Sequence, residues 1–284
     1  AFYRFSRRHP EVETMFIQNG LRTFYGVFDR LEELGQLKNN LAVDHMMCFG
    51  KAIARKYQQY LSGSATVMGS LRNNREECSA KFVKNSIAYV SQWSQLGLKV
   101  AGKVFTSNEF FGIPDQLVLD FLAEYAKTKN KKLYVIPRNG VSSPDRVAEE
   151  RYFSRILGGS CFFMRRDALE SGYSAIDSAD VLVGIDSTLL YEAAARGKKV
   201  AFFSIREEML GIKAREFGWP SNLPPEGSFW TNRVSENKFT EVLDYLFNLA
   251  EEDRHRDEEV IRDLMVFDPG NRILKRTLTE VLNK

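Results

Sequence analysis

The sequence predicts an α/β protein made of two domains with parallel sheets, followed by closing helices at the C-terminal end. Two observations lead to this prediction. Apolar, β-rich runs alternate with stretches of helical periodicity over most of the chain, and strands that alternate with helices of this length form parallel sheets covered on both faces. After residue 230 the pattern changes to consecutive helical segments.

Eight apolar, β-rich runs are expected to be strands, at residues 14–18, 43–49, 65–69, 86–92, 132–137, 160–165, 180–185 and 199–203. Between the strands, residues 114–130 have helical periodicity, with Leu117, Phe121, Leu122 and Tyr125 largely on one face. Residues 236–253, 256–267 and 271–284 are the three expected closing helices.

The chain length and one polar segment predict the domain organisation. A chain of 284 residues fits one large or two ordinary α/β domains. The segment GSLRNNREECSAK is polar, turn-rich and follows a strand, so we predict an N-terminal domain over 1–78 and a C-terminal domain over 79–284. The last helix could pack on either domain. The chain starts without Met, and AFYRFSRRHPE is typical of the middle of a protein, so the first domain is expected to be truncated.

Composition excludes several classes of protein. Hydrophobic and charged contents of 44% and 27% are those of a soluble globular protein. A net charge of +3, evenly spread, argues against nucleic-acid binding. The three cysteines are far apart and show no CxxC spacing, which favours a reducing, cytoplasmic compartment over a disulfide framework or a zinc site. No apolar run approaches the roughly 18 residues of a membrane helix. A complete G-x-G-x-x-G fingerprint is also missing, so an NAD-type dehydrogenase is not supported.

The candidate ligand-binding residues follow the strands, because open α/β sheets bind ligands at the carboxyl ends of their strands. Nearly all of these positions are polar, basic or glycine, although loops in general are polar. The candidate substrate-binding residues at the strand ends and at the helix after 180–185 are Gln18, Asn19, Gly20, Gly69, Ser70, Arg72, Asn73, Arg138, Asp186, Ser187, Thr188, Leu189, Glu192 and Arg206.

The segment ADVLVGIDSTLLYEAAARGKKVAFFS reads as strand, turn, helix and strand. The helix is expected to begin near Ser187 or Thr188, where its first N–H groups and the helix dipole would form an anion site. The alternative is that one of these residues is simply an N-cap. Glu192 is at the wrong spacing for a capping box. It is therefore expected to accept hydrogen bonds from a sugar diol, the alternative being a solvent-exposed helix glutamate.

The segment GIDSTLLYEAAARGKKVAFFS resembles the donor-site segment of GT-B glycosyltransferases. It is more closely similar to bacterial surface-carbohydrate biosynthesis proteins, which share D-S-T-L-x-Y-E followed by A-R-G-K. The segments IQNGLRTF, VDHMMCFGKAIARKY, VMGSLRNN and FDPGNRIL also resemble that family, in the same order. The resemblance implies two Rossmann-like domains that face a cleft, with the nucleotide-sugar held by the C-terminal domain and the acceptor on the N-terminal side.

The family is distantly related to transferases that use CMP-Kdo, so the implied sugar includes Kdo or a related acidic sugar. In some of those enzymes an Asp-Gly pair supplies the catalytic carboxylate, and the comparable pair here is Asn19-Gly20. The resemblance implies a nucleotide-sugar donor and a glycan or glycolipid acceptor in surface polysaccharide synthesis. With no membrane helix expected, contact with the inner face of the cytoplasmic membrane would be peripheral.

Sugar transfer requires a stabilised leaving phosphate and a base for the acceptor hydroxyl. The sequence contains no D-x-D motif, so we expect no metal or other cofactor, and Arg72, Arg138, Arg206 and the helix N-terminus would stabilise the phosphate. The candidate catalytic residues are Asp44, His45 and Asn19, although a lone histidine in an apolar run is more often a packed core residue.

Two other function classes stay open. The first is a related enzyme, either a nucleotide-sugar epimerase or a CDP-glycerol-type phosphotransferase. The second is a catalytically inactive module that binds a nucleotide-sugar.

Overall fold

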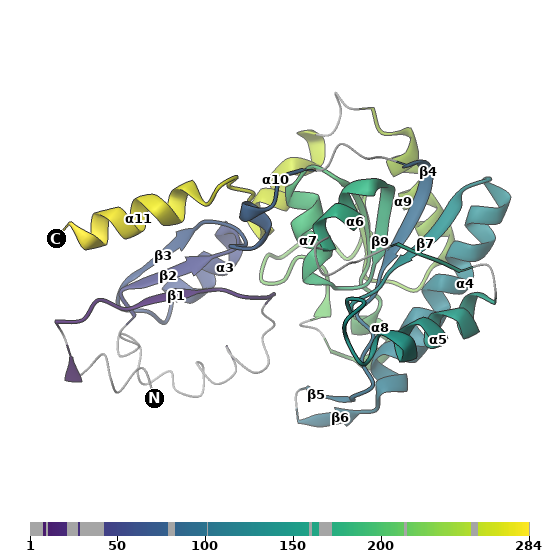
Figure 1. Ribbon diagram of the computed structural model, residues 1–284, viewed down its shortest axis with the longest axis horizontal. Helices are drawn as coiled ribbons and strands as arrows, with labels where there is room; N and C mark the ends of the chain where they lie inside the picture. The colour runs from purple at the N-terminus through teal and green to yellow at the C-terminus, as the bar shows by residue number, and fades with distance from the viewer. Residues whose placement is uncertain are drawn as a thin grey trace. The chain divides into compact units, whose positions relative to one another are not determined.

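The computed structural model of the chain describes residues 8–9, 11–21, 28, 43–78, 83–100, 102–158, 161–164, 172–212, 215–250 and 255–283. The chain folds into two compact units (Figure 1). Unit 1 comprises residues 1–77, 218–222 and 258–284, and unit 2 comprises residues 78–217 and 223–257. Each unit has its own parallel sheet.

Unit 1 is built on a three-stranded parallel sheet in the order β1-β2-β3. The strands are β1 (Met15–Ile17), β2 (His45–Cys48) and β3 (Ser64–Val67). Among the described residues, the helices of unit 1 include α3 (Lys51–Gln58), the one-turn 3₁₀ helix η3 (Asn73–Arg75), α10 (His255–Leu264), which begins in unit 2, and α11 (Arg272–Leu282).

The core of unit 1 joins the sheet to the C-terminal helix. Met47 and Met68 are fully buried and cluster with Leu274 of α11, and Met15 and Ile273 pack against this cluster. The prediction assigned 79–284 to one domain, whereas the structure assigns 258–284 to unit 1. The physical reason is that α11 covers apolar side chains of the first sheet, which a periodic pattern cannot reveal because it does not identify the surface that a helix covers.

Unit 2 is built on six parallel strands in the order β11-β10-β9-β4-β7-β8. The strands are β4 (Val83–Val90), β7 (Lys132–Ile136), β8 (Phe162–Phe163), β9 (Ala179–Gly184), β10 (Lys199–Phe203) and β11 (Trp230–Thr231). The helices are η4, one π-helical segment (Asn108–Gly112), α4 (Ile113–Thr128), α5 (Arg146–Leu157), α6 (Gly172–Ser178), α7 (Thr188–Ala195), α8 (Arg206–Leu210) and α9 (Glu236–Asn248).

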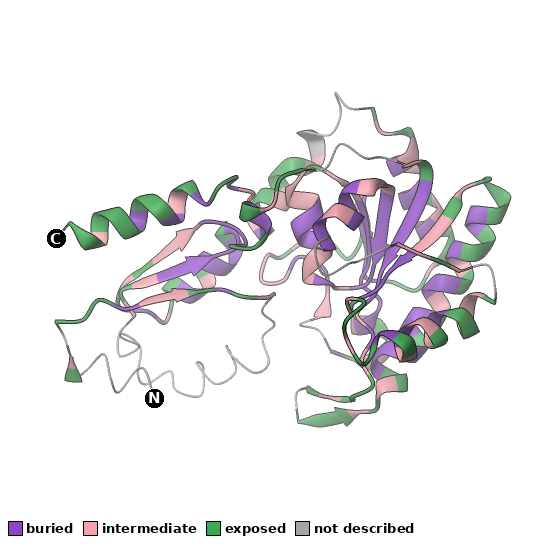
Figure 2. Ribbon diagram, in the orientation of Figure 1, coloured by how far each residue is buried: buried purple, intermediate pink, exposed green. Residues whose placement is uncertain are grey.

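Helices cover both faces of the larger sheet. Consecutive strand residues point to opposite faces, and Phe203 stacks on Phe239 of α9 at 4.2 Å, while Phe202 contacts Tyr191 of α7 at 4.7 Å. Phe121 of α4 lies on the Phe203 side, 5.2 Å from Phe239. Figure 2 shows that the central strands β4 and β9 are largely buried.

The predicted α/β architecture with parallel sheets and closing helices is confirmed, and the second sheet is the larger one. Each of the eight expected strands overlaps an observed strand, although β3, β4 and β9 begin one to three residues before the predicted start. The antiparallel hairpin of β5 (Leu98–Val100) and β6 (Lys103–Phe105) and the two-residue strand β11 were not predicted. Both features are too short to give a period-2 signal.

Candidate functional site

The connection order of the larger sheet marks a ligand site. From β4 the chain builds β7 and β8 on one side, and it then returns to place β9, β10 and β11 on the other side. Ligands of open α/β sheets bind outside the carboxyl ends of the strands at such a switch point. Here the switch lies between β4 and β9, so the loops 91–93 and 185–187 border the candidate site.

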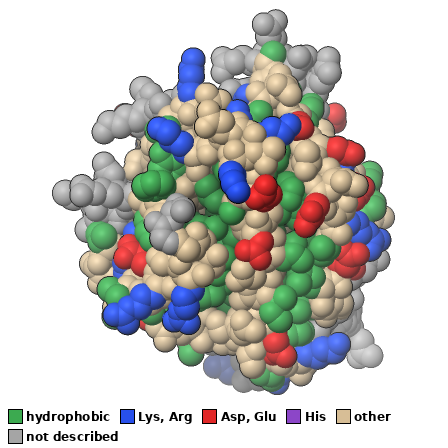
Figure 3. Space-filling view, turned by 90° about the vertical axis from the view of Figure 1, so that its right-hand side faces the viewer, with side chains coloured by type: hydrophobic (Ala, Val, Ile, Leu, Met, Phe, Trp, Pro, Cys, Tyr) green, Lys and Arg blue, Asp and Glu red, His purple; other side chains and the backbone are tan. Residues whose placement is uncertain are grey.

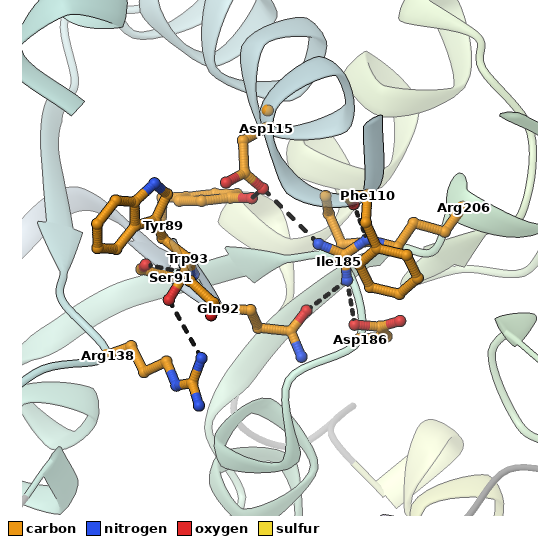
Figure 4. Close-up of polar contacts among 12 residues, drawn as sticks. Tyr89, Ser91, Gln92, Trp93, Phe110, Asp115, Arg138, Ile185, Asp186 and Arg206 are labelled. Atoms are coloured by element: carbon orange, nitrogen blue, oxygen red, sulfur yellow. Dashed lines mark hydrogen bonds and ion pairs between the residues drawn. The ribbon is translucent and has the colours of Figure 1, made fainter. Parts of the chain in front are cut away.

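A buried ion pair fixes the turn after β9 (Figure 4). Arg206 has a side-chain exposure of 1%, and its Nη1 group donates to the Asp186 carboxylate and, at 2.6 Å, to Oε1 of Gln92. Its Nε group donates to the carbonyl of Phe110 at 2.9 Å. Arg215 approaches the other Asp186 oxygen at 3.3 Å. Asp186 and Arg206 were predicted to bind substrate, but burial leads them to bind each other.

Arg206 also approaches a second buried carboxyl group. Its Nη2 lies 3.9 Å from Oδ1 of Asp115 and has no hydrogen-bond partner within the described part of the chain. The hydroxyl groups of Tyr89 and Tyr152 donate to Asp115 at 2.7 and 3.2 Å. The guanidinium group of Arg206 therefore lies between two carboxyl groups, those of Asp115 and Asp186 (Figure 4).

The two carboxyl groups differ in their pKa values. Burial opposes ionisation of Asp186, but Arg206 and Arg215 overcome this effect and hold its pKa below the ordinary value. Burial raises the pKa of Asp115 to about 6, against the lowering effects of Arg206 and the two tyrosine hydroxyls. Asp186 is thus the ionised partner of Arg206 at neutral pH, and Asp115 titrates close to physiological pH.

Helix α7 begins directly after this turn. Ser187 is its N-cap, and its Oγ accepts a hydrogen bond from the Leu189 N–H at 3.3 Å. Glu192 is one turn further along and is 7% exposed, so it is not the solvent-exposed helix glutamate of the alternative interpretation. Thr188 and Glu192 are four residues apart and therefore share one face of the helix. The N-terminus of α7, which is the positive end of the helix dipole, consequently lies at the switch point.

Arg138 follows β7, the strand next to β4 on the other side of the switch. Its side chain is exposed, and Nη1 donates to the carbonyl of Trp93 at 3.2 Å (Figure 4). The ends of β7 and β9 are separated by β4, which is about 10 Å at the usual strand spacing. Arg138 and the start of α7 therefore border the same stretch of the carboxyl edge.

Glu149 of α5 holds the loop that carries Arg138. The Glu149 carboxylate is fully buried and accepts four hydrogen bonds, from Ser91 Oγ, Arg138 N, Asn139 N and Asn139 Nδ2, at 2.5 to 2.9 Å. Sequence reasoning did not identify Glu149, Asp115 or Arg215. They lie within or next to helices, outside the strand ends on which the prediction relied, and no local motif distinguishes them.

In unit 1 several predicted ligands have structural partners. Gln18 is 2% exposed, and its amide accepts from the Phe49 N–H at 2.9 Å and donates to the Gly20 carbonyl at 3.0 Å. A Cβ atom at Gly69, where φ is +78°, would lie 2.2 Å from the Val266 carbonyl oxygen. Glycine is therefore required there for the approach of the protein's own backbone.

The loop after β3 is held by Asn74, which was not among the predicted ligands. The Asn74 Nδ2 group donates to the Met68 carbonyl and to Oδ1 of Asn271, and its Oδ1 accepts from the Asp268 N–H. Ser70 and Asn73 of the same loop are buried. This loop is thus fastened to the FDPGN segment. Of the unit 1 candidates at the carboxyl edge, Asn19 and Arg72 have exposed side chains.

Asp44 and His45 lie at the opposite edge of the first sheet. They stand at the beginning of β2, whereas the other candidates follow the strands. Asp44 accepts hydrogen bonds from the N–H and hydroxyl of Thr14, and His45 Nε2 lies 3.2 Å from Glu13. The structure therefore does not bring these two base candidates together with the residues at the carboxyl edge, because a strand separates the two edges.

The described residues offer few signs of other ligand classes. On the face shown in Figure 3, Lys and Arg side chains are interspersed with Asp and Glu and form no broad basic stripe. Within the described ranges, no three His, Cys, Asp or Glu residues are grouped so that they could hold a metal ion. None of the helices described is both long and apolar enough to span a membrane.

Comparison with known families agrees with the resemblance seen in the sequence. Residues 15–282 match the model of a family described as "putative O-antigen biosynthesis protein", and the chain belongs to this family. No curated protein matches the sequence.

Solved structures show a shared fold at low identity. A "putative UDP-N-acetylglucosamine 2-epimerase" from Listeria monocytogenes is 16% identical, with a TM-score of 0.55 over 99% of this chain and 71% of that chain. The UDP-GlcNAc 2-epimerase from Neisseria meningitidis is 13% identical, with a TM-score of 0.50 over 97% and 72%. TarM is 10% identical, with a TM-score of 0.50 over 97% and 51%. The chain thus spans about half of TarM, and 54% of a pneumococcal O-GlcNAc transferase. At these identities the likeness shows a GT-B type of fold.

Proposed function

We propose that this member of the O-antigen biosynthesis family is a metal-independent GT-B glycosyltransferase. It binds a nucleotide-activated sugar at the carboxyl edge of the six-stranded sheet and transfers the sugar to a surface polysaccharide or glycolipid acceptor. The observation that carries the proposal is the switch point between β4 and β9, which the start of α7 borders directly and Arg138 borders one strand further along.

The residues at this edge fit the parts of a nucleotide-sugar. The N-terminus of α7, with Ser187, Thr188 and Leu189, would receive the phosphate groups, because a helix N-terminus attracts anions. Arg138 would add a full positive charge as the leaving phosphate develops negative charge. Glu192 would accept hydrogen bonds from the ribose hydroxyls, since it lies about 6 Å along the axis from the helix start.

The buried ion pair contributes to the same site indirectly. Arg206 and Arg215 keep Asp186 ionised and hold the turn that leads into α7. The ion pair thereby fixes the direction of the helix N-terminus. Its positive and negative charges largely neutralise each other. Exclusion of water from this pair strengthens it relative to a surface ion pair.

We propose that the acceptor binds to unit 1. Asn19 and Gly20 follow β1 and Arg72 follows β3, so all three belong to the carboxyl edge of the smaller sheet. Arg72 suits an anionic acceptor or an acidic sugar such as Kdo, because its guanidinium group can bind a carboxylate in bidentate fashion.

The test is to incubate the protein with CMP-, CDP-, UDP- and GDP-linked sugars and CDP-glycerol, together with a bacterial glycolipid and polysaccharide extract as acceptor, with and without EDTA, and to measure release of free nucleotide. We expect release from one class of sugar donor, unchanged by EDTA. Conversion of the sugar without nucleotide release would identify an epimerase, and release from CDP-glycerol alone would identify a phosphotransferase. Binding without turnover of any donor would identify an inactive module.

A further inference from the structure

We infer that Glu149 is the positioning residue of the donor site, an inference that rests on the proposed function. Glu149 lies on α5 and does not itself follow a strand, yet its carboxylate binds the residues that follow two adjacent strands. It fixes the carboxyl ends of β4 and β7 relative to each other and thereby determines where Arg138 presents its charge.

The geometry shows one carboxylate shared by two loops. Oε1 of Glu149 accepts from the Ser91 hydroxyl at 2.5 Å, after β4, and from the Arg138 N–H at 2.7 Å, after β7. Oε2 accepts from the N–H and the side-chain amide of Asn139, both at 2.9 Å. Ser91 Oγ in turn accepts from the Trp93 N–H at 3.1 Å. The positions of polar groups of four residues, Ser91, Trp93, Arg138 and Asn139, are therefore coupled through a single side chain.

Both oxygens of Glu149 act as acceptors toward this set of partners. All four groups that contact Glu149 are donors, and an ionised carboxylate is an acceptor at both oxygens. Glu149 is in the first turn of α5, where the helix dipole favours a negative charge. A glutamine of the same shape would present its NH₂ group to one pair of donors and leave them unsatisfied.

Arg138 is the link between this network and a ligand. Its backbone N–H donates to Glu149, and its exposed guanidinium group donates to the carbonyl of Trp93 at 3.2 Å. The backbone contact of Arg138 with Glu149 is direct, and its side-chain contact with Trp93 is linked to Glu149 through Ser91. Loss of the carboxylate should release the guanidinium group from its defined position at the switch point.

The test compares the parent protein with Glu149→Gln and with the control Asp177→Asn. Asp177 lies on α6 and is a similarly buried carboxylate of unit 2. It pairs with Arg196, which directly follows α7, away from the strand-end loops. Amide hydrogen exchange of residues 137–143 is measured without ligand, and binding of free CMP, CDP, UDP and GDP is measured by calorimetry. We expect faster exchange at 138–139 and about tenfold weaker nucleotide binding for Glu149→Gln, and neither change for Asp177→Asn.

A double variant tests whether Glu149 acts through Arg138. In an Arg138→Ala background, Glu149→Gln should weaken binding by less than twofold, because the positioned group is already missing. If Glu149→Gln binds the nucleotide as tightly as the parent, or weakens binding equally in both backgrounds, the inference is wrong and the proposed function stands. If the parent binds none of the four nucleotides, the proposed function fails, and the inference fails with it whatever the exchange data show.

Discussion

Replacing Asp115 by Asn should change how the stability of unit 2 depends on pH. The carboxyl group is fully buried, and its pKa is raised to about 6 from an ordinary value of 3.8. The folded state therefore binds this proton more tightly than the unfolded state. The stabilising contribution of this bound proton is complete at pH values below the pKa of Asp115 in the unfolded state. It is lost as the pH rises through the folded-state pKa of about 6.

The magnitude follows from the pKa difference. A shift of about two units corresponds to roughly 3 kcal/mol between the protonated and ionised forms. Asn resembles the protonated form and does not titrate. The free energy of unfolding of Asp115→Asn, relative to that of the parent, should therefore increase by a few kcal/mol between pH 4 and pH 7, with most of the change below pH 6.5.

The assay is urea unfolding at half-unit steps from pH 4 to pH 7.5, followed by the fluorescence of Trp93 and Trp230 of unit 2. Tyr152→Phe is the companion variant, because the Tyr152 hydroxyl lowers the pKa of Asp115, and its removal should move the titration to higher pH. Stability curves of parent and Asp115→Asn that run parallel across the whole range would refute the reasoning.

Three further substitutions probe the two units. Glu192→Ala should weaken nucleotide binding by one to two orders of magnitude, the equivalent of a charge-assisted hydrogen bond of about 1.5–3 kcal/mol, with the fold retained. Calorimetry measures the nucleotide affinity of this variant. An affinity equal to that of the parent would show that Glu192 has only a structural role. Arg206→Met should destabilise unit 2 by about 3–5 kcal/mol, because Asp186 loses its buried partner; a loss below about 1 kcal/mol in urea unfolding would contradict this. Asn74→Ala should accelerate amide exchange at Asp268, whose N–H donates to Oδ1 of Asn74, whereas unchanged exchange would show that the FDPGN segment is held by other contacts.

The strands and their parallel arrangement were predictable because buried strands of this kind have a strong compositional signal. The runs at 180–185 and 199–203 are apolar after their first residues, Asp180 and Lys199, as expected for strands covered on both faces. The order of the strands was not predictable, because neighbouring positions in a sheet are fixed by long-range pairing. The return of the chain from β8 to the far side of β4, which creates the switch point, has no local sequence signal.

The rule that ligands meet strand ends selected residues with different surroundings in the structure. It identified Arg138 and Ser187, which border the switch point. It did not exclude Gln18 and Gly69, whose partners are other parts of the protein. Polar residues are needed at strand ends both to bind ligands and to satisfy the backbone groups of the adjoining loops, and a single sequence does not separate these two uses.

Arg138 and Arg206 show what decides between the two uses. Each follows a strand of the same sheet by a few residues, and each was predicted to bind phosphate. Arg206 is covered by η4, whose Phe110 ring lies 4.8 Å from the guanidinium carbon, so its desolvated charge requires the buried Asp186 as a partner. Arg138 lies on a loop whose backbone donates to Glu149, and the Arg138 side chain is exposed. The covering segment, more than the residue type, therefore places Arg206 in a buried ion pair and leaves the Arg138 side chain exposed at the carboxyl edge.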